Sequence, residues 1–111
     1  MMEILLTHND EIALLKVIGA ITADNVNIFQ EKLDEILQGD SKKLEIDFSE
    51  CNTINSIGIG KILTFYKDFT ERKGSETHAS SLREVEIIKC STTIFDLFMT
   101  IKLNQLISIS M

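Results

Sequence analysis

Two short apolar segments flank a turn-forming pair at the start of the chain. Residues 3–7 and 11–19 are rich in aliphatic side chains and flank the pair Asn9-Asp10, which favours a tight turn. We predict that the two segments form a β-hairpin and that Gly19 closes its second strand.

From Ala23 the apolar positions recur at steps of three and four residues, the spacing of one face of an α-helix. Thr22 precedes this run, where its hydroxyl would accept a hydrogen bond from a first-turn N–H, and Gly39 follows it. We therefore predict an amphipathic helix with Thr22 as its N-cap and Gly39 just beyond its C-terminus. Its buried face would consist of Val26, Phe29, Leu33, Ile36 and Leu37.

A strand pattern followed by a helical pattern occurs again in the middle of the chain. Residues 43–48 alternate and then meet the polar run at residues 49–52, so we predict a second principal strand that ends there. After Asn55-Ser56 the helical period returns and predicts a second helix. The apolar face of this helix would consist of Ile59, Ile62, Leu63, Tyr66 and Phe69.

The last third of the chain predicts one loop followed by strand, helix and strand. Residues 72–83 contain one leucine and one alanine among polar and small residues, and we predict a long, poorly ordered loop there. Residues 84–90 and 106–110 have the character of strands, and residues 92–100 carry apolar side chains at helical spacing.

Strands that alternate with helices in a chain of 111 residues predict the α/β class. Parallel strands need long crossovers, and the helices supply them. We predict a single domain over residues 1–111, with a mostly parallel sheet of four to five strands, three to four helices and right-handed crossovers.

The charge balance argues against nucleic acid as a partner. The chain has 11 Lys and Arg against 17 Asp and Glu, a formal net charge of −6 at pH 7. A protein that binds the phosphate backbone needs clustered basic residues instead. There is also no run of about 20 apolar residues that could cross a bilayer, and an acid stands where a signal peptide would be basic. We predict a cytoplasmic protein without membrane insertion.

The cysteines and histidines predict neither a disulfide scaffold nor a metal site. Cys51 and Cys90 are too few for a scaffold and lack C-x-x-C spacing, so we interpret both as free thiols. His8 and His78 are far apart and belong to no spaced ligand set. We predict no metal and no cofactor.

The turn over residues 53–60, TINSIGIG, is the strongest candidate for a functional site. In open α/β sheets, sites form beyond the carboxyl ends of the strands, where loops lead into helix N-termini. Gly58 and Gly60 would each weaken the helix by about 1 kcal/mol relative to Ala, but they would let another surface approach closely. Ser56 is the hydroxyl at this point. The alternative interpretation is that Asn55 or Ser56 merely caps the helix.

Known catalytic motifs do not fit this turn. The run from Gly58 to Lys61 lacks the glycine span and the Lys-Ser/Thr pair of a phosphate-binding P-loop. A serine hydrolase would place glycines on both sides of its nucleophile, whereas Ser56 follows Ile54 and Asn55. We therefore predict that the protein is not an enzyme.

Residues 44–60, LEIDFSECNTINSIGIG, resemble the central signature of STAS domains, the family of bacterial anti-sigma factor antagonists. That signature is a strand with Asp, a short connection, and then Asp-Ser-Ser/Thr-Gly-Leu-Gly opening a helix. Gly19 resembles the glycine that ends the second strand, and residues 103–106 resemble a late Gly-Leu-Asp-x-Leu segment. The resemblance extends over nearly the whole chain and implies a STAS-like fold.

In that family, the serine directly after the Asp is phosphorylated by the partner anti-sigma factor, a kinase that uses ATP. The resemblance places this role on Ser56. A phosphate adds roughly −1.5 to −2 charges, which a helix N-terminus tolerates but a flat, partly apolar docking surface opposes.

Three positions depart from the family pattern. Asn55 replaces the signature Asp, and Thr22 stands in place of another Asp at the start of the first helix, so two acids near the site have become neutral. Ile57 replaces a small hydroxyl residue and puts an apolar side chain beside Ser56.

Three functional hypotheses follow from these residues. The first is a binding module that docks on an anti-sigma factor. The second is an unphosphorylated STAS scaffold subunit of a larger signalling or transport assembly, which the neutral Asn55 and Thr22 suggest. The third, a small enzyme, lacks a convergent acid, base and nucleophile. The docking surface of the first would comprise Thr22, Asn55, Ser56, Ile57, Gly58 and Gly60.

Overall fold

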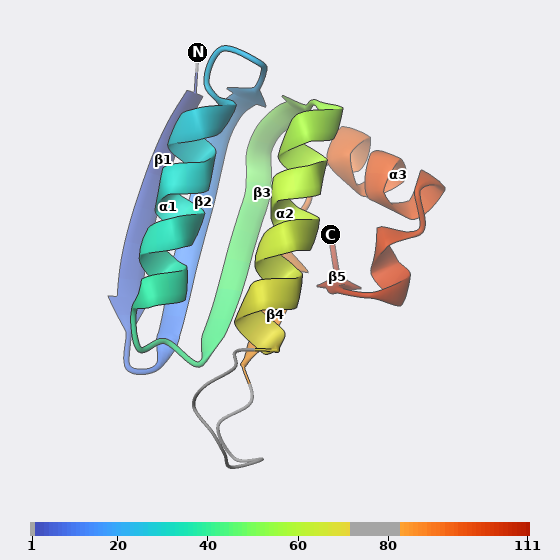
Figure 1. Cartoon of the computed structure of the whole chain (residues 1–111). Coiled ribbons are helices and arrows are strands. Elements are labelled where there is room, and N and C mark those ends of the chain that lie inside the picture. The colour runs from blue at the N-terminus through green and yellow to red at the C-terminus, as the bar shows by residue number, and fades with distance from the viewer. Residues whose placement is uncertain (1, 72–82) are drawn as a thin grey trace.

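The computed structural model describes residues 2–71 and 83–111. It consists of one β-sheet with helices packed on it (Figure 1). Within these residues the strands are β1 (Met2–Asn9), β2 (Ile12–Ile21), β3 (Lys43–Ile54), β4 (Glu84–Ile88) and β5 (Ser108–Ile109). The helices are α1 (Val26–Gln38), α2 (Ser56–Thr70), α3 (Thr92–Thr100) and the short 3-10 helix η2 (Leu103–Gln105). The predicted α/β class, strand number and helix number are confirmed.

The strands lie in the sheet in chain order, β1-β2-β3-β4-β5. β1 is antiparallel to β2, as the predicted hairpin requires, and each later pair is parallel. Every parallel crossover therefore steps in the same direction across the sheet. Right-handed crossovers that all step the same way place their helices on the same face. Figure 1 shows α1 and α2 side by side on that face.

The hydrophobic core fills the space between this face and the helices. β2 and β3 contribute side chains at every second position, including Leu15, Leu44, Ile46 and Phe48. The ring of Phe98 from α3 meets that of Phe48 edge to face, with centroids 5.6 Å apart. α1 buries Val26, Phe29, Leu33 and Ile36 as predicted, whereas Leu37 is half-buried. α2 buries Ile62 and Phe69 as predicted, and also Phe65, while Ile59, Leu63 and Tyr66 are half-buried against the core.

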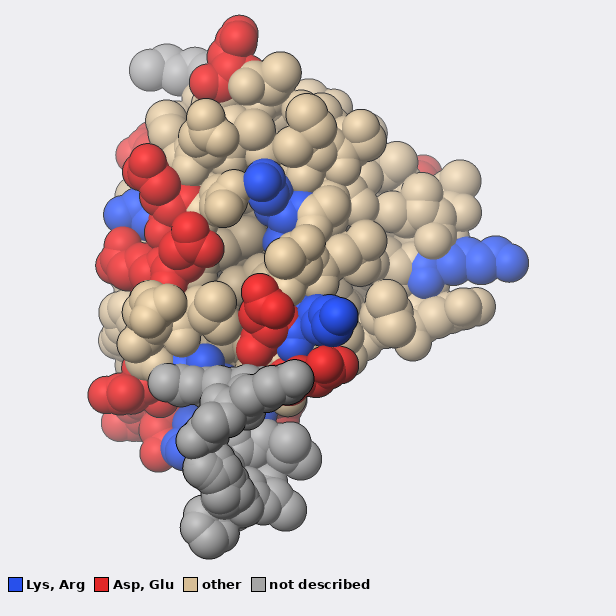
Figure 2. All heavy atoms as spheres, in the orientation of Figure 1, with Lys and Arg blue, Asp and Glu red and all other residues tan. Residues whose placement is uncertain are grey.

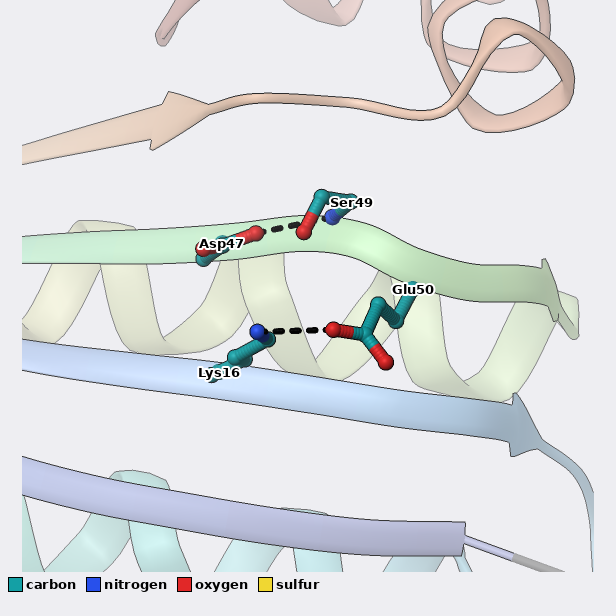
Figure 3. A network of polar contacts seen from close by, with 4 residues as sticks. All are labelled: Lys16, Asp47, Ser49 and Glu50. Atoms are coloured by element: carbon teal, nitrogen blue, oxygen red, sulfur yellow. Dashed lines mark hydrogen bonds and ion pairs between the residues drawn. The ribbon is translucent and has the colours of Figure 1, made fainter.

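The opposite face of the sheet, which we call the open face, carries charged side chains. Lys16 Nζ lies 2.8 Å from Glu50 Oε2, and Lys43 Nζ lies 3.0 Å from Glu86 Oε1. Figure 3 shows Lys16 and Glu50 on neighbouring strands, with the helices behind the sheet. The hydrogen bond to Glu50 raises the pKa of Lys16. Such exposed pairs add little to stability.

Two β-bulges make β3 longer than predicted. Lys16 is opposite Asp47 and Ile18 is opposite Glu50, so β3 carries one extra residue there, and a second shift follows Gly19. In the first bulge Asp47 is buried, and its carboxylate accepts a hydrogen bond from the Ser49 N–H at 2.8 Å. The polar run at residues 49–52 therefore belongs to the strand, and the predicted end at Phe48 is wrong.

The start of α1 also differs from the prediction. Residues 22–25 form a turn in which the Val26 N–H donates to the Thr22 carbonyl, and the helix begins at Val26. Thr22 Oγ1 accepts from the Asp24 N–H, so its hydroxyl stabilises the turn and does not cap the helix. The prediction of Thr22 as N-cap is wrong, whereas Gly39 follows the helix as predicted.

Elements in the last third of the chain are of the predicted type, but the two strands are shorter than predicted. β4 ends at Ile88, and Lys89 has a positive φ of 55°. α3 matches the predicted range, and β5 contains two residues. Residues 72–82 of the predicted loop lie outside the described residues, but Arg83, its last residue, is buried.

Arg83 fastens the C-terminal end of α1 to the core. Its Nε donates to the Ser41 carbonyl at 2.9 Å, and its terminal nitrogens donate to the carbonyls of Leu37 and Gly39. The guanidinium carbon lies 4.2 Å from the ring centroid of Phe69. The last carbonyls of a helix have no partner within it, so the planar guanidinium supplies the missing donors. The prediction that Arg83 lies in a poorly ordered loop is wrong.

We expect Arg83→Ala to lower the free energy of unfolding by about 3 kcal/mol, because it leaves buried carbonyls without donors. Denaturant unfolding measures this change. Lys42→Ala is the matched control, since it removes an exposed basic side chain from the same region and should change stability by less than about 0.5 kcal/mol. Equal losses for the two variants would show that Arg83 acts through its charge and not through its hydrogen bonds.

Candidate functional site

The carboxyl ends of β2 and β3 bring the candidate residues to one rim of the sheet. Ile21 is opposite Ile54 at the ends of these strands, and the Asn55 N–H donates to the Ile21 carbonyl at 3.0 Å. The turn that begins at Thr22 therefore lies beside the start of α2. This rim is where open α/β sheets form their binding sites.

Asn55 is the N-cap of α2. Its backbone is extended, with φ −83° and ψ 171°, and its Oδ1 accepts from the Gly58 N–H at 2.7 Å. The sequence left open whether Asn55 or Ser56 caps the helix, and the geometry selects Asn55. Because an amide oxygen performs this task as well as a carboxylate, replacing the family Asp leaves the helix start intact.

Ser56 is the first residue of α2, and its side chain is exposed. Its hydroxyl makes no hydrogen bond to any residue that the structure describes. The free N–H groups of the first turn and the helix dipole favour negative charge at this end of the helix. Ser56 can therefore carry an added group without the loss of a structural contact.

Ile57 provides an apolar surface next to Ser56, since half of it is accessible to solvent (52%). Residues four and seven positions later, Lys61 and Thr64, share its flank of the helix. These two line a shallow cavity of about 90 Å³ between α1 and α2, together with Gln30 and Asp34. Ile57 thus lies on the same flank of α2 as two of the residues that line this cavity.

The two glycines of the first turns differ in their surroundings. A Cβ on Gly58 would lie 2.9 Å from both Ile21 Cγ2 and Ile54 Cγ1, so Gly58 lets α2 approach the ends of β2 and β3. Among the described residues, a Cβ on Gly60 would meet nothing within 4 Å. Packing within this part of the chain therefore requires Gly58 but does not require Gly60.

The turn at residues 22–25 is held by Asn25 as well as by Thr22. Asn25 Oδ1 accepts from the Thr22 N–H at 2.8 Å, and Asn25 Nδ2 donates to the Ala20 carbonyl at 2.9 Å. Asp24 in the same turn is exposed. Neither Asp24 nor Asn25 was among the residues predicted for the site, although Asp and Asn residues are a known signal for a turn.

Both cysteines are buried free thiols, as predicted. Burial raises the pKa of Cys51, whose Sγ donates to the Thr53 carbonyl at 3.4 Å. Burial, together with the nearby charges of Asp47 and Cys51, raises the pKa of Cys90 to about 11. Neither thiol is therefore activated as a nucleophile.

Residues 2–71 and 83–111 contain neither a metal cluster nor a helix suited to a membrane. No three or more His, Cys, Asp or Glu side chains in these ranges are grouped so that they could hold a metal ion. None of the helices in this part of the chain is long and apolar enough to cross a bilayer.

The chain matches one known protein family over most of its length. The sequence profile of the STAS domain matches residues 3–105. No curated protein matches the chain significantly.

Three solved structures share the fold at low sequence identity. An anti-sigma factor antagonist from Mycobacterium paratuberculosis is 15% identical, with a TM-score of 0.79 over 99% of this chain and 86% of that one. The phosphorylated form of the Bacillus cell fate determinant SpoIIAA is 16% identical, with a TM-score of 0.69 and coverage of 98% and 92%. The STAS domain of a SulP transporter from Vibrio cholerae is 14% identical, with a TM-score of 0.65 and coverage of 95% and 77%.

We expect opposite stability effects from alanine at the two glycines. Gly58→Ala should lower the free energy of unfolding by about 1–3 kcal/mol, because the new methyl group overlaps Ile21 and Ile54. Gly60→Ala should raise it by up to about 1 kcal/mol, since alanine favours the helix and the space is open. Denaturant unfolding of both variants tests the pair, and equal shifts would contradict this description of the helix start.

Alkylation of the cysteines should be slow in the folded protein at pH 7.5 and should accelerate as the pH rises. A raised pKa keeps each thiol protonated at neutral pH, and the thiolate is the reactive form. Iodoacetamide labelling followed by intact-mass spectrometry measures the rate, with Cys51→Ala and Cys90→Ala separating the two sites. Rapid labelling of the folded protein at pH 7.5 would show that the structure around the cysteines opens readily.

Proposed function

The chain belongs to the STAS domain family, and from this premise we propose that it is an anti-sigma factor antagonist-like binding module. It docks on an anti-sigma factor that is also a serine kinase, and phosphorylation of Ser56 releases it. As part of the same proposal, the module acts by binding and not as an enzyme. We place it in the cytoplasm, where such partners act.

The exposure of Ser56 at the start of α2 is the observation that carries this proposal. Asn55 caps α2 by accepting from the Gly58 N–H, so Ser56 can be modified while the helix remains formed. One structural neighbour, the Bacillus protein SpoIIAA, has been solved in a phosphorylated form with the same fold. The exposed hydroxyl, the intact cap and this neighbour together support Ser56 as the modified residue.

The surface around Ser56 suits a docking contact that a phosphate would disrupt. Figure 2 shows mostly uncharged atoms around the N-terminal end of α2, while acidic side chains gather over α1. The exposed α1 acids are Glu31, Asp34 and Glu35.

A phosphate of roughly −1.5 to −2 charges would have to be desolvated when this surface docks, and it would repel acidic groups of the partner. A change of about 3 kcal/mol in binding free energy corresponds to more than a hundredfold in affinity. The helix N-terminus itself tolerates the phosphate, so the fold persists while the contact fails.

The docking surface combines the turn after β2 with the first turns of α2. We propose that Ile57 is its apolar anchor and that Thr22 and Asn55 supply polar contacts around it. Gly60 leaves space for a partner side chain or backbone, because nothing in the described chain occupies that space.

A second candidate function is an unphosphorylated scaffold subunit of a larger assembly. Neutral Thr22 and Asn55 favour it, because no acid stands at either position to help position a metal-bound nucleotide. Another structural neighbour is the STAS domain of a SulP transporter. In this case the same surface would bind its partner permanently.

The decisive experiment uses intact-mass spectrometry after incubation with the purified anti-sigma factor kinases of the source organism and ATP. We expect one phosphate, lost in Ser56→Ala. Asn55→Asp, which restores the family acid and keeps a capping oxygen, should be phosphorylated faster than the natural chain. Stable binding of a partner without phosphate transfer would favour the scaffold function instead.

Ser56→Asp should weaken binding to the kinase by about a hundredfold in calorimetric titration while leaving the melting temperature nearly unchanged. Thr92→Asp is the matched control, because Thr92 is likewise the exposed first residue of a helix on the same rim. It should leave the affinity within about twofold. Parallel losses of affinity and melting temperature in Ser56→Asp would indicate a structural role for Ser56.

A further inference from the structure

The outer edge of the sheet is formed by β1, which is eight residues long. Its pairing with β2 is continuous from Met2 opposite Gly19 to Asn9 opposite Ile12, without a bulge. Figure 1 shows β1 at the side of the sheet away from α3, and no described strand pairs with its free edge. At the other side of the sheet, β5 contains two residues.

Edge strands of natural proteins are normally protected against pairing by proline, lysine, bulges or a covering loop. β1 contains no proline, lysine or arginine, and its one acidic residue is Glu3. Apart from the charge of Glu3, β1 therefore has none of these protective residues and no bulge. An edge of this length is a ready template for another strand.

Apolar side chains on both faces of β1 are incompletely covered. Ile4 and Leu6 pack against the core on the helix-covered face but are half-buried, because no further strand lies beside them in the described chain. Leu5 points to the open face and is 46% exposed. An added strand would cover these three side chains.

The turn at the end of the hairpin determines which residues of β1 direct their N–H and C=O groups toward β2 and which direct them outward. Two residues, Asp10 and Glu11, connect Asn9 to Ile12, so Asn9 and Ile12 form the closing hydrogen-bonded pair. Alternation along the strand then directs the N–H and C=O groups of odd-numbered residues toward β2. The corresponding groups of Met2, Ile4, Leu6 and His8 point outward.

We propose that a second copy of this chain pairs with this edge, β1 against β1, antiparallel about a two-fold axis through Leu5. Ile4 of each copy then forms a hydrogen-bonded pair with Leu6 of the other, and Met2 pairs with His8. Leu5 meets Leu5 in a non-hydrogen-bonded pair, in which side chains approach most closely. The outward groups of the four even-numbered residues all find partners in this register.

The charges of β1 permit this register. Each Glu3 lies opposite Thr7 of the second copy, so no like charges face each other. The two Glu3 side chains are separated by four strand residues, roughly 14 Å, whereas the Debye length at physiological salt is about 8 Å. The register that centres on Leu6 would put Leu5 opposite Thr7 and lose the apolar match.

The paired edge leaves the rim of the sheet free. α1 lies between β1 and α2 in Figure 1, so two copies joined through β1 would both expose Ser56. The pairing is therefore independent of the proposed partner and of phosphorylation, and either proposal can fail without the other.

Sedimentation equilibrium of the full chain, at concentrations from about 5 μM to about 500 μM, tests the pairing; contacts of this small size give weak dimers. We expect a monomer–dimer equilibrium. Leu5→Lys puts two lysines opposite each other at the axis and should raise the dimer Kd by about tenfold or more. Thr7→Lys, the matched control on the same face, places lysine opposite Glu3 and should preserve or tighten the dimer.

Amide hydrogen exchange measured by NMR distinguishes this edge from any other contact. The amides of Ile4 and Leu6 should gain protection as the concentration rises, whereas those of Leu5 and Thr7 should be protected at every concentration. A monomer throughout the range would overturn the proposal. So would a dimer that Leu5→Lys leaves intact, since the copies would then meet elsewhere. Melting temperatures of both variants show whether each remains folded.

Discussion

The handedness of the crossovers is the constraint on which the arrangement of this molecule depends. Because β2, β3, β4 and β5 follow one another across the sheet, right-handed connections force all helices onto one face. The core is then one-sided, and the open face is exposed, where it carries ion pairs such as Lys16–Glu50. Because β2, β3 and β4 are parallel, their carboxyl ends and the strand-to-helix turns that follow them lie at one rim. The turn after β2 and the start of α2 are neighbours there for topological reasons, before any side chain is considered.

At that rim, the residue that caps α2 and the candidate phosphorylation site are two different residues. Asn55 bonds the Gly58 N–H, and its own N–H bonds the carbonyl of Ile21, so it joins the end of β2 to the start of α2. Gly58 permits the close contact with Ile21 and Ile54 that this junction needs. Ser56 lies one residue further on and contributes to none of these contacts. The contacts of this junction therefore do not depend on the Ser56 hydroxyl, which is exposed beside them.

The sequence predicted the elements whose periodicity is strong and misplaced those in which local hydrogen bonding competes. The hairpin, α2 and α3 follow their apolar patterns closely. β3 was predicted to end at Phe48, because its bulges interrupt the alternation that identifies a strand. α1 begins at Val26 because the side chains of Thr22 and Asn25 bond within the preceding turn. Arg83 was missed because its partners are carbonyls more than forty residues earlier, which no local pattern reveals.

The position of the candidate site could be predicted because Asn55, Ser56 and the two glycines form a pattern within six residues. The identity of the capping residue could not be predicted, since Asn and Ser are equally good caps. The backbone geometry of Asn55 shows that it is the cap. The same limit applies to the glycines, which are identical in sequence terms. Gly58 serves the fold, whereas the open space beside Gly60 serves nothing within the described chain. The absence of a side chain at Gly60 leaves the backbone near Ser56 accessible, and the proposed docking would use this space.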